Sequence, residues 1–180
     1  MPIALKRLAG RFGSDDRGTV TVEFVIVLPL LMLWFVGSFV FFQTYRNFSH
    51  AEKASFAISD IMSRQSEVDS AFLDELDLLF ERLLPRRPTG QWLRVSSISY
   101  DAANGYEVLW SHNAAGGDVV TDASALGEFL PAMADGDTVI LTETYVPYRP
   151  MVDWVGIPAM TFANRVVARP RYVSAVAKTD

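Results

Sequence analysis

The sequence predicts an α+β protein in which an N-terminal helix crosses a membrane and a separate head follows. Three observations support this: an uncharged apolar run near the N-terminus, helical periodicity after it, and short β-rich runs with turn signals towards the C-terminus. Helices precede strands, which is the order of an α+β fold. We therefore expect a basic cytoplasmic segment (1–18), a membrane helix (19–43), a helical stem (44–64) and an α+β head with a helix and a small antiparallel sheet (65–180).

The composition limits the classes of protein that the chain can represent. It has 180 residues, of which 50% are hydrophobic, so it can bury one modest core and still supply one membrane segment. The formal net charge is -5, which gives no general attraction to phosphates, and we expect no nucleic-acid partner. Cysteine is absent, which excludes disulfides, thiolate nucleophiles and zinc sites with cysteine ligands.

An uncharged apolar segment runs from Phe24 to Phe42, with the sequence FVIVLPLLMLWFVGSFVFF. A helix of this length rises about 30 Å, which is the thickness of the hydrocarbon core of a bilayer. The alternative is a buried helix of a soluble protein, but a chain of this size would have to cover a helix that is apolar on every face. Pro29 and Gly37 are compatible with a span, because both residue types are commoner in membrane helices than in soluble ones.

Basic residues flank this segment unequally. Arg46 and Lys53 follow it, whereas four basic residues precede it: Lys6, Arg7, Arg11 and Arg17. Because basic residues are retained on the cytoplasmic side, we expect the N-terminus to be cytoplasmic and the head to lie across the membrane. A cleaved signal peptide is the competing interpretation, but it would end in small residues, which Phe39–Gln43 does not supply. An ordinary signal anchor, which is not cleaved, remains an alternative interpretation of this segment.

One carboxylate stands at the inner edge of the apolar run. Glu23 directly precedes Phe24 and comes five residues after Gly18. A charged side chain costs about 2 to 3 kcal/mol at the centre of a membrane helix and less near the surface, so this position needs an explanation. On physical grounds two explanations stay open: Glu23 is solvated among the lipid headgroups, or it has a specific charged partner.

The residues around Glu23 resemble a type IV prepilin leader, in which a peptidase cuts after a glycine and a glutamate is fifth in the mature chain. The longer stretch DRGTVTVEFVIVLPLL, from Asp16 to Leu31, is similar to the leader of the TadE-like pseudopilins of tight-adherence (Flp) pilus systems. The stretch VVARPRY, from Val166 to Tyr172, is a weaker match to the end of that family. Major pilins are either very short or carry a longer head with its own helix proline further along. The resemblance therefore implies a minor pseudopilin or assembly component with a pilin-like head.

The resemblance also implies roles and partners. A prepilin peptidase of a bacterial inner membrane would cut between Gly18 and Thr19, and Glu23 would pair with the new amine of Thr19 in its own chain or a neighbouring subunit. The head would be periplasmic or extracellular. The expected partners are this peptidase, other pseudopilins and assembly proteins of the inner membrane, and the lipid bilayer. Packing within the membrane would involve Phe24, Pro29 and Gly37.

Two helices are predicted beyond the expected span. From Gln43 to about Arg64, apolar or small residues recur at helical spacing, so the membrane helix should continue outwards as an amphipathic stem. A second helix is predicted from Asp69 to Leu84, because Asp69 can cap it, an apolar stripe follows and Pro85 ends it.

The remaining pattern is rich in β-formers. The predicted strands are Trp92–Tyr100, Tyr106–Ser111, Thr138–Val146 and Asn164–Val173. Asn104-Gly105 is a hairpin signal, and a short helix is expected from Ala123 to Ala134. We expect Pro147–Pro158 to form an ordered loop or edge, with Trp154 packed on the sheet.

The residues give little support to an enzyme. His50 lies in the stem and His112 at the end of a strand, and neither has a recognisable partner spacing, so both are expected to be exposed polar residues. The acidic residues of the second helix are expected to form a solvated face: Asp74, Glu75, Asp77 and Glu81. We expect no catalytic residue, metal or cofactor.

The sequence is compatible with two alternative functions. A bitopic protein that senses a ligand or serves as a scaffold in the cell envelope would keep its leader as an uncleaved signal anchor. A membrane-anchored hydrolase would need His112 to meet acidic residues in a pocket.

Overall fold

The structure is a computed structural model that describes residues 19–85 and 88–180. The chain divides into two compact units, residues 1–42 and 43–180, which are described separately. The described helices and strands, in chain order, are α2 (Thr19–Ser63), β1 (Glu67–Val68), α3 (Ser70–Leu83), β2 (Trp92–Asp101), β3 (Gly105–Asn113), β4 (Thr138–Tyr148), β5 (Met160–Ala168) and β6 (Ala177–Lys178), with the short 3-10 helices η2 (Ser124–Leu126) and η3 (Asp153–Val155).

The first unit contains the N-terminal part of α2, which remains helical through Pro29. This part is apolar and long enough to cross a membrane. The expected α+β class is confirmed in outline, with a long apolar helix first and a small antiparallel sheet later.

The second unit begins with the remainder of α2, residues 43–63, which we call the stem. Small or apolar side chains at helical spacing are buried along one side of it: Ala51, Ala54, Ser55, Ile58 and Met62. Small residues at this spacing allow a helix to lie close to a sheet. The stem therefore forms one wall of the core.

Helix α3 begins as its sequence predicts. The Asp69 carboxylate accepts a hydrogen bond from the backbone N–H of Phe72, at 2.8 Å, which satisfies a donor left free at the helix start. Leu73, Leu76 and Phe80 form its buried side. The helix ends before Pro85, as predicted.

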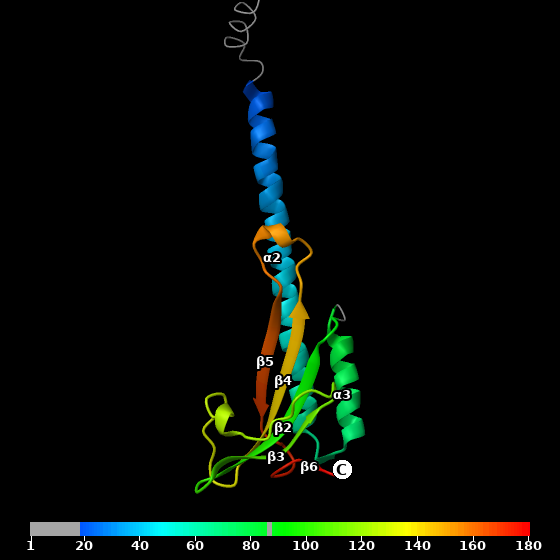
Figure 1. The fold of residues 1–180 in the computed structure, drawn as a ribbon, viewed down its shortest axis with the longest axis vertical. Coiled ribbons are helices and arrows are strands. Elements are labelled where there is room, and N and C mark those ends of the chain that lie inside the picture. The colour runs from blue at the N-terminus through cyan, green and yellow to red at the C-terminus, as the bar shows by residue number, and fades with distance from the viewer. Residues whose placement is uncertain (1–18, 86–87) are drawn as a thin grey trace, which may run out of the picture. The chain divides into compact units, whose positions relative to one another are not determined.

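Four antiparallel strands form the main sheet, in the order β3-β2-β4-β5 (Figure 1). The β2–β3 hairpin closes where Asp101 pairs with Gly105, which has φ 81°, so the predicted Asn104-Gly105 turn is confirmed. A second, two-stranded sheet pairs β1 with β6 in parallel. The C-terminal strand β6 therefore lies beside the short segment that connects the stem to α3.

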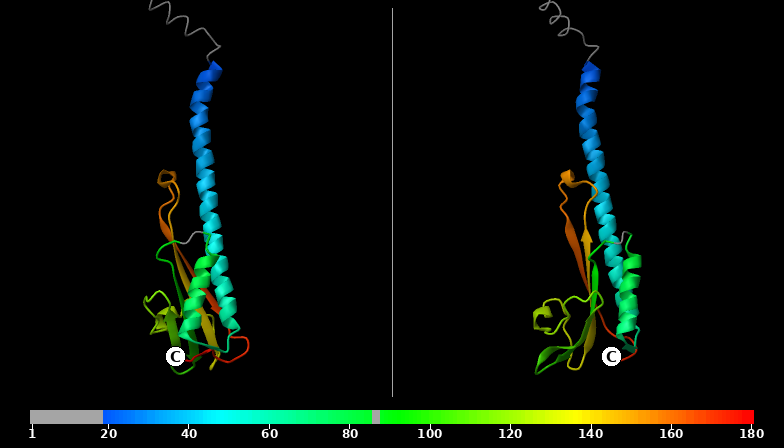
Figure 2. Two further views of the ribbon diagram at one scale, coloured as in Figure 1. Left: turned by 90° about the vertical axis from the view of Figure 1, so that its right-hand side faces the viewer. Right: turned by 45° about the vertical axis from the view of Figure 1, so that its right-hand side comes forward.

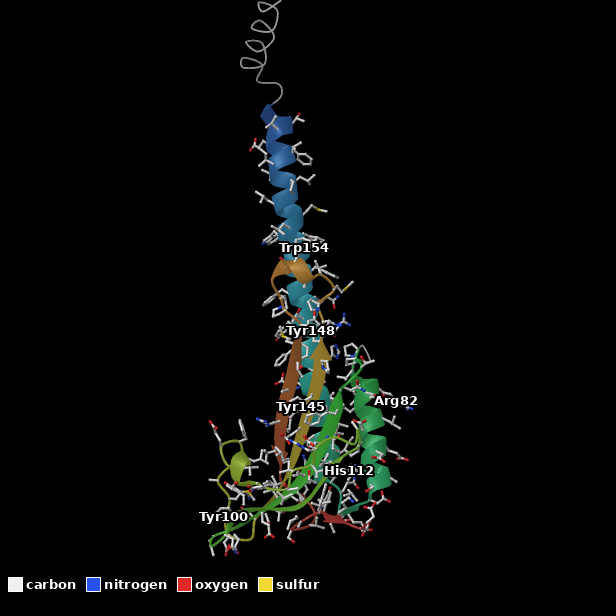
Figure 3. All side chains as sticks on the ribbon, in the orientation of Figure 1. Arg82, Tyr100, His112, Tyr145, Tyr148 and Trp154 are labelled. Atoms are coloured by element: carbon white, nitrogen blue, oxygen red, sulfur yellow. The ribbon has the colours of Figure 1, made fainter. Side chains whose placement is uncertain are left out.

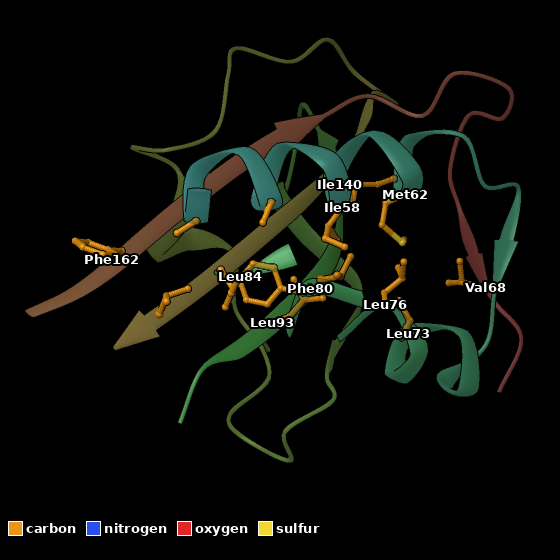
Figure 4. Close-up of a cluster of buried hydrophobic side chains, with 14 of the residues drawn as sticks. Ile58, Met62, Val68, Leu73, Leu76, Phe80, Leu84, Leu93, Ile140 and Phe162 are labelled. Carbon is orange, nitrogen blue, oxygen red and sulfur yellow. The ribbon is translucent and has the colours of Figure 1, made fainter. Parts of the chain in front are cut away.

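The two faces of the main sheet are covered differently. Helix α3 and the stem lie on one side, and the segment between β3 and β4 lies on the other (Figure 2). Between the helices and the sheet is the larger core, which includes Ile58, Phe80 and Ile140 (Figure 4). On the opposite face, Leu126 and Leu130 cover Ile98, Val139 and Leu141 in a smaller core.

Two predicted elements differ from the structure. Strand β5 covers Met160–Ala168 and not Asn164–Val173, because the chain leaves the sheet near Pro170, and the backbone N–H of Arg171 donates to the carbonyl of Ser63 at 2.8 Å. The predicted helix from Ala123 to Ala134 is reduced to the single turn η2. Gly127 and Pro131 explain the early end, since neither residue favours a helix interior.

Candidate functional site

The segment that the sequence marks as functional is the N-terminal part of α2, residues 19–42. Thr19 is the first residue of the described helix, and Gly18 lies outside the described residues. Glu23 follows Thr19 by one helical turn, and its side chain is exposed. Among the described residues, the side chain of Glu23 makes no hydrogen bond or ion pair. The predicted cleavage at Gly18 and the predicted amine pairing of Glu23 remain predictions.

The apolar surface of residues 20–35 is not covered by other described residues. Every residue from Val20 to Phe35 is exposed, so the described residues bury no single face of this part of the helix. Phe24 is 60% exposed, Pro29 lies within the helix and Gly37 is half-buried. Burial of one such apolar side chain contributes about 1.5 to 3 kcal/mol, so an apolar environment around the segment would stabilise it greatly.

A separate charged cluster lies on the face of the sheet opposite the stem. Arg94 on β2, Glu143 on β4 and Arg165 on β5 are cross-strand neighbours in register. The side chain of Glu143 is only 1% exposed, and its two oxygens lie 2.6 Å from Arg94 Nη2 and 3.0 Å from Arg165 Nε. We call these three residues the arginine–glutamate ladder.

Aromatic rings surround this ladder. The guanidinium of Arg94 lies 5.3 Å from the ring of Trp92, which stacks on Tyr145 at 4.0 Å. The guanidinium of Arg165 lies 4.2 Å from the ring of Phe129. Burial alone would lower the pKa of Arg165. The hydrogen bond to Glu143 and the negative charge of Glu143 have the larger combined effect, so the pKa of Arg165 is raised. Because both oxygens of Glu143 accept from arginines, the ladder is a closed structural network.

The ladder was not singled out from the sequence. Its only signal was a charged residue within each of three predicted strands, at Arg94, Glu143 and Arg165. Each charge alone is compatible with an exposed strand face. Their alignment depends on the register of β4 with both neighbours, which the sequence does not specify.

His112 has a partner that its sequence context did not reveal. Its Nε2 lies 3.0 Å from Oδ1 of Asp74 on α3, and its side chain is 20% exposed. The expectation that His112 is an exposed polar residue is therefore wrong, because its side chain is largely covered. The cause is packing of α3 against the sheet, which brings together residues that are far apart in the sequence.

Asp77 also departs from the expected solvated face of α3. It is half-buried, and one of its carboxylate oxygens, Oδ1, is buried with no hydrogen-bond partner among the described residues. Burial raises the pKa of Asp77, and the charges of Glu81 and Asp74 raise it further, while a hydrogen bond from the backbone of Leu93 acts in the opposite direction. Among the described residues, no group of three or more histidine and acidic side chains could hold a metal ion.

A pocket of about 390 Å³ opens in the second unit near the end of β4. Its lining combines the start of the stem, the end of α3 and the β4–β5 hairpin, and includes Asn47, Leu84, Tyr148, Arg149 and Phe162. Beside it, the hydroxyls of Tyr148 and Thr44 share a hydrogen bond of 2.8 Å. Neither His112 nor Asp74 lines this pocket.

Comparisons of the chain with protein-family models, with curated proteins and with solved structures found no match.

Proposed function

We propose that the chain is a minor pseudopilin or assembly component of a bacterial tight-adherence (Flp) pilus, anchored in the inner membrane by residues 24–42. The observation that carries this proposal is the N-terminal part of α2, where Glu23 lies one turn from the helix start and an uncovered apolar surface follows. An adhesion system of this kind acts through helix packing and contacts of the head with other proteins. The orientation proposed from the basic flank places the N-terminus in the cytoplasm.

Processing would give Glu23 a partner within reach. Cleavage after Gly18 would leave a free amine on Thr19, and residues four apart are neighbours on one face of a helix. In the low dielectric of the membrane this pair would be much stronger than in water. The amine of an adjacent subunit could replace that of the same chain, and assembly would then satisfy a charge that is costly in isolation.

The first test is the mass of the protein purified from its native host membranes. The proposal expects a mature chain that begins at Thr19. A chain that still begins at Met1, or one that begins after Phe42, would contradict it.

The second test compares Glu23→Gln with the matched control Glu52→Gln on the exposed side of the stem. We expect Glu23→Gln to abolish or strongly reduce pilus formation while the amount of protein in the membrane stays the same, because the substitution removes only the charge. Glu52→Gln should assemble normally. Equal pilus formation by both variants would favour the interpretation in which Glu23 is solvated among headgroups.

The pocket beside Tyr148 supports a second candidate, a membrane-anchored protein that senses a ligand or acts as a scaffold in the cell envelope. Its volume of about 390 Å³ falls within the size range of small-molecule sites. This function requires the leader to be retained, so the same mass measurement separates the two candidates.

A further inference from the structure

The connection between β4 and β5, residues 149–159, exposes large apolar side chains; we call it the hairpin tip. Met151 is 63% and Trp154 is 66% exposed, although the sequence predicted that Trp154 packs on the sheet. Val155 and Ile157 are only partly covered. A tryptophan and a methionine left in water on one short connection form an apolar surface that favours a non-aqueous partner.

Two hydrogen bonds fix the direction in which this tip points. Ser55 on the stem bonds Thr144 on β4 at 2.6 Å, and Thr44 bonds Tyr148 at 2.8 Å. As residue numbers rise along β4 they fall along the stem, so the strand runs antiparallel to the helix. The hairpin tip therefore lies at the end of the second unit where the stem begins, whereas Tyr100 lies at the other end of the sheet (Figure 3).

That end of the stem is also where the proposed span ends. Thr44 comes two residues after Phe42, the last residue of the uncharged apolar run. The neighbouring exposed residues are those that favour a bilayer surface: Tyr45 and Arg46 on the stem, and Arg149 at the start of the tip. Tyrosine and tryptophan concentrate at the headgroup level, and arginine pairs there with lipid phosphates.

We propose that the hairpin tip inserts Met151 and Trp154 into the surface of the bilayer, on the side where the head lies. This inference rests on the membrane span of the proposed function. The lipid surface is favoured over a second copy of the chain because the tip lies at the end of the second unit that the chain joins directly to the span, and because it carries the aromatic, apolar and cationic residues of an interfacial segment. Together, the span and the tip attach the head at two points, which limits its rotation and tilt on the membrane.

The absence of cysteine allows a direct test on the full chain. Three single-cysteine variants, Trp154→Cys, Trp34→Cys and Ala103→Cys, are spin-labelled and reconstituted in vesicles of phosphatidylethanolamine and phosphatidylglycerol. Trp34 reports on the span, and Ala103 is an exposed position in the β2–β3 turn. The measurement is the accessibility of each label to oxygen, which concentrates in lipid, relative to a water-soluble nickel chelate.

We expect the ratio of oxygen to nickel accessibility to be several-fold higher at positions 154 and 34 than at position 103. A lipid-like ratio at 34 with a water-like ratio at 154 would overturn the tip proposal and leave the span intact. Protection of position 154 from both reagents would indicate contact with another copy and would also overturn it. A water-like ratio at 34 would contradict the span itself, and the tip proposal with it.

Discussion

Arg94 lies directly opposite Glu143 on the neighbouring strand, and its Nη2 atom is 2.6 Å from the Oε2 atom of a carboxylate that is almost completely buried. Arg165 binds the other oxygen from the opposite side. A buried charge is costly unless it is paired and fully hydrogen-bonded, and the two arginines meet both conditions. The ladder thereby ties three adjacent strands together through side chains as well as through the backbone.

Substitution Glu143→Gln should destabilise the head by about 3 kcal/mol, because it leaves two partly buried arginines without their shared counter-charge. The free energy of unfolding of the full chain in detergent, measured with denaturant, checks this value. The control is Glu107→Gln, an exposed residue on β3, which should change the free energy by less than about 0.5 kcal/mol. Similar effects of the two substitutions would show that the ladder contributes little.

Ser55 and Thr144 form a buried side-chain pair between the stem and the sheet. Ser55→Ala should destabilise the head by about 1 to 3 kcal/mol, because the hydroxyl of Thr144 loses its partner where water cannot replace it. The double variant Ser55→Ala with Thr144→Val should cost less than the sum of the two single substitutions. A double-mutant cycle of unfolding free energies measures this coupling. Additive effects would mean that the two hydroxyls act independently.

Asp77 makes the stability of the head depend on pH. Its raised pKa means that the folded state holds this proton more tightly than the unfolded state, so ionisation of Asp77 lowers stability as pH rises through the interval between the ordinary and the raised pKa. Asp77→Asn should therefore unfold at a higher temperature than the parent at neutral pH. The gain should stay below about 1 kcal/mol, because solvent screens a half-buried group.

Thermal unfolding at neutral pH and at a pH below the ordinary carboxyl range tests this prediction. The advantage of Asp77→Asn should shrink at the lower pH, where the parent is also uncharged at this position. Glu75→Gln, on the exposed side of the same helix, serves as the control. A gain that is independent of pH would point to packing and not to charge.

Local signals in the sequence were sufficient for several elements. Asp69, the apolar stripe after it and Pro85 defined α3 nearly to the residue, and Asn104-Gly105 defined the β2–β3 turn. These features depend on neighbours in the chain. The end of β5 was misplaced because it depends on a long-range hydrogen bond, from Arg171 to Ser63, that no local pattern records.

The same distinction applies to the sites. The candidate assembly segment was visible in the sequence because Gly18, Glu23 and the apolar run lie within one short stretch of the chain. The pairing of His112 with Asp74 joins residues from a strand and a helix that meet only in the fold. Trp154 was misjudged because an apolar residue between prolines suggests a packed loop, whereas the connection projects beyond the end of the sheet and leaves the ring in water.

The antiparallel arrangement of β4 and the stem has a mechanical consequence. Between Thr44 and Ser55 the helix advances about 16 Å, while β4 advances about 13 Å from Thr144 to Tyr148, so the two elements run side by side over that length. A pull along the stem axis loads both hydrogen bonds and the buried contacts between them at the same time, in shear. When force is applied to the head through its own helix, these contacts must break together. The head would therefore resist that force better than it would in a geometry where the contacts break one after another.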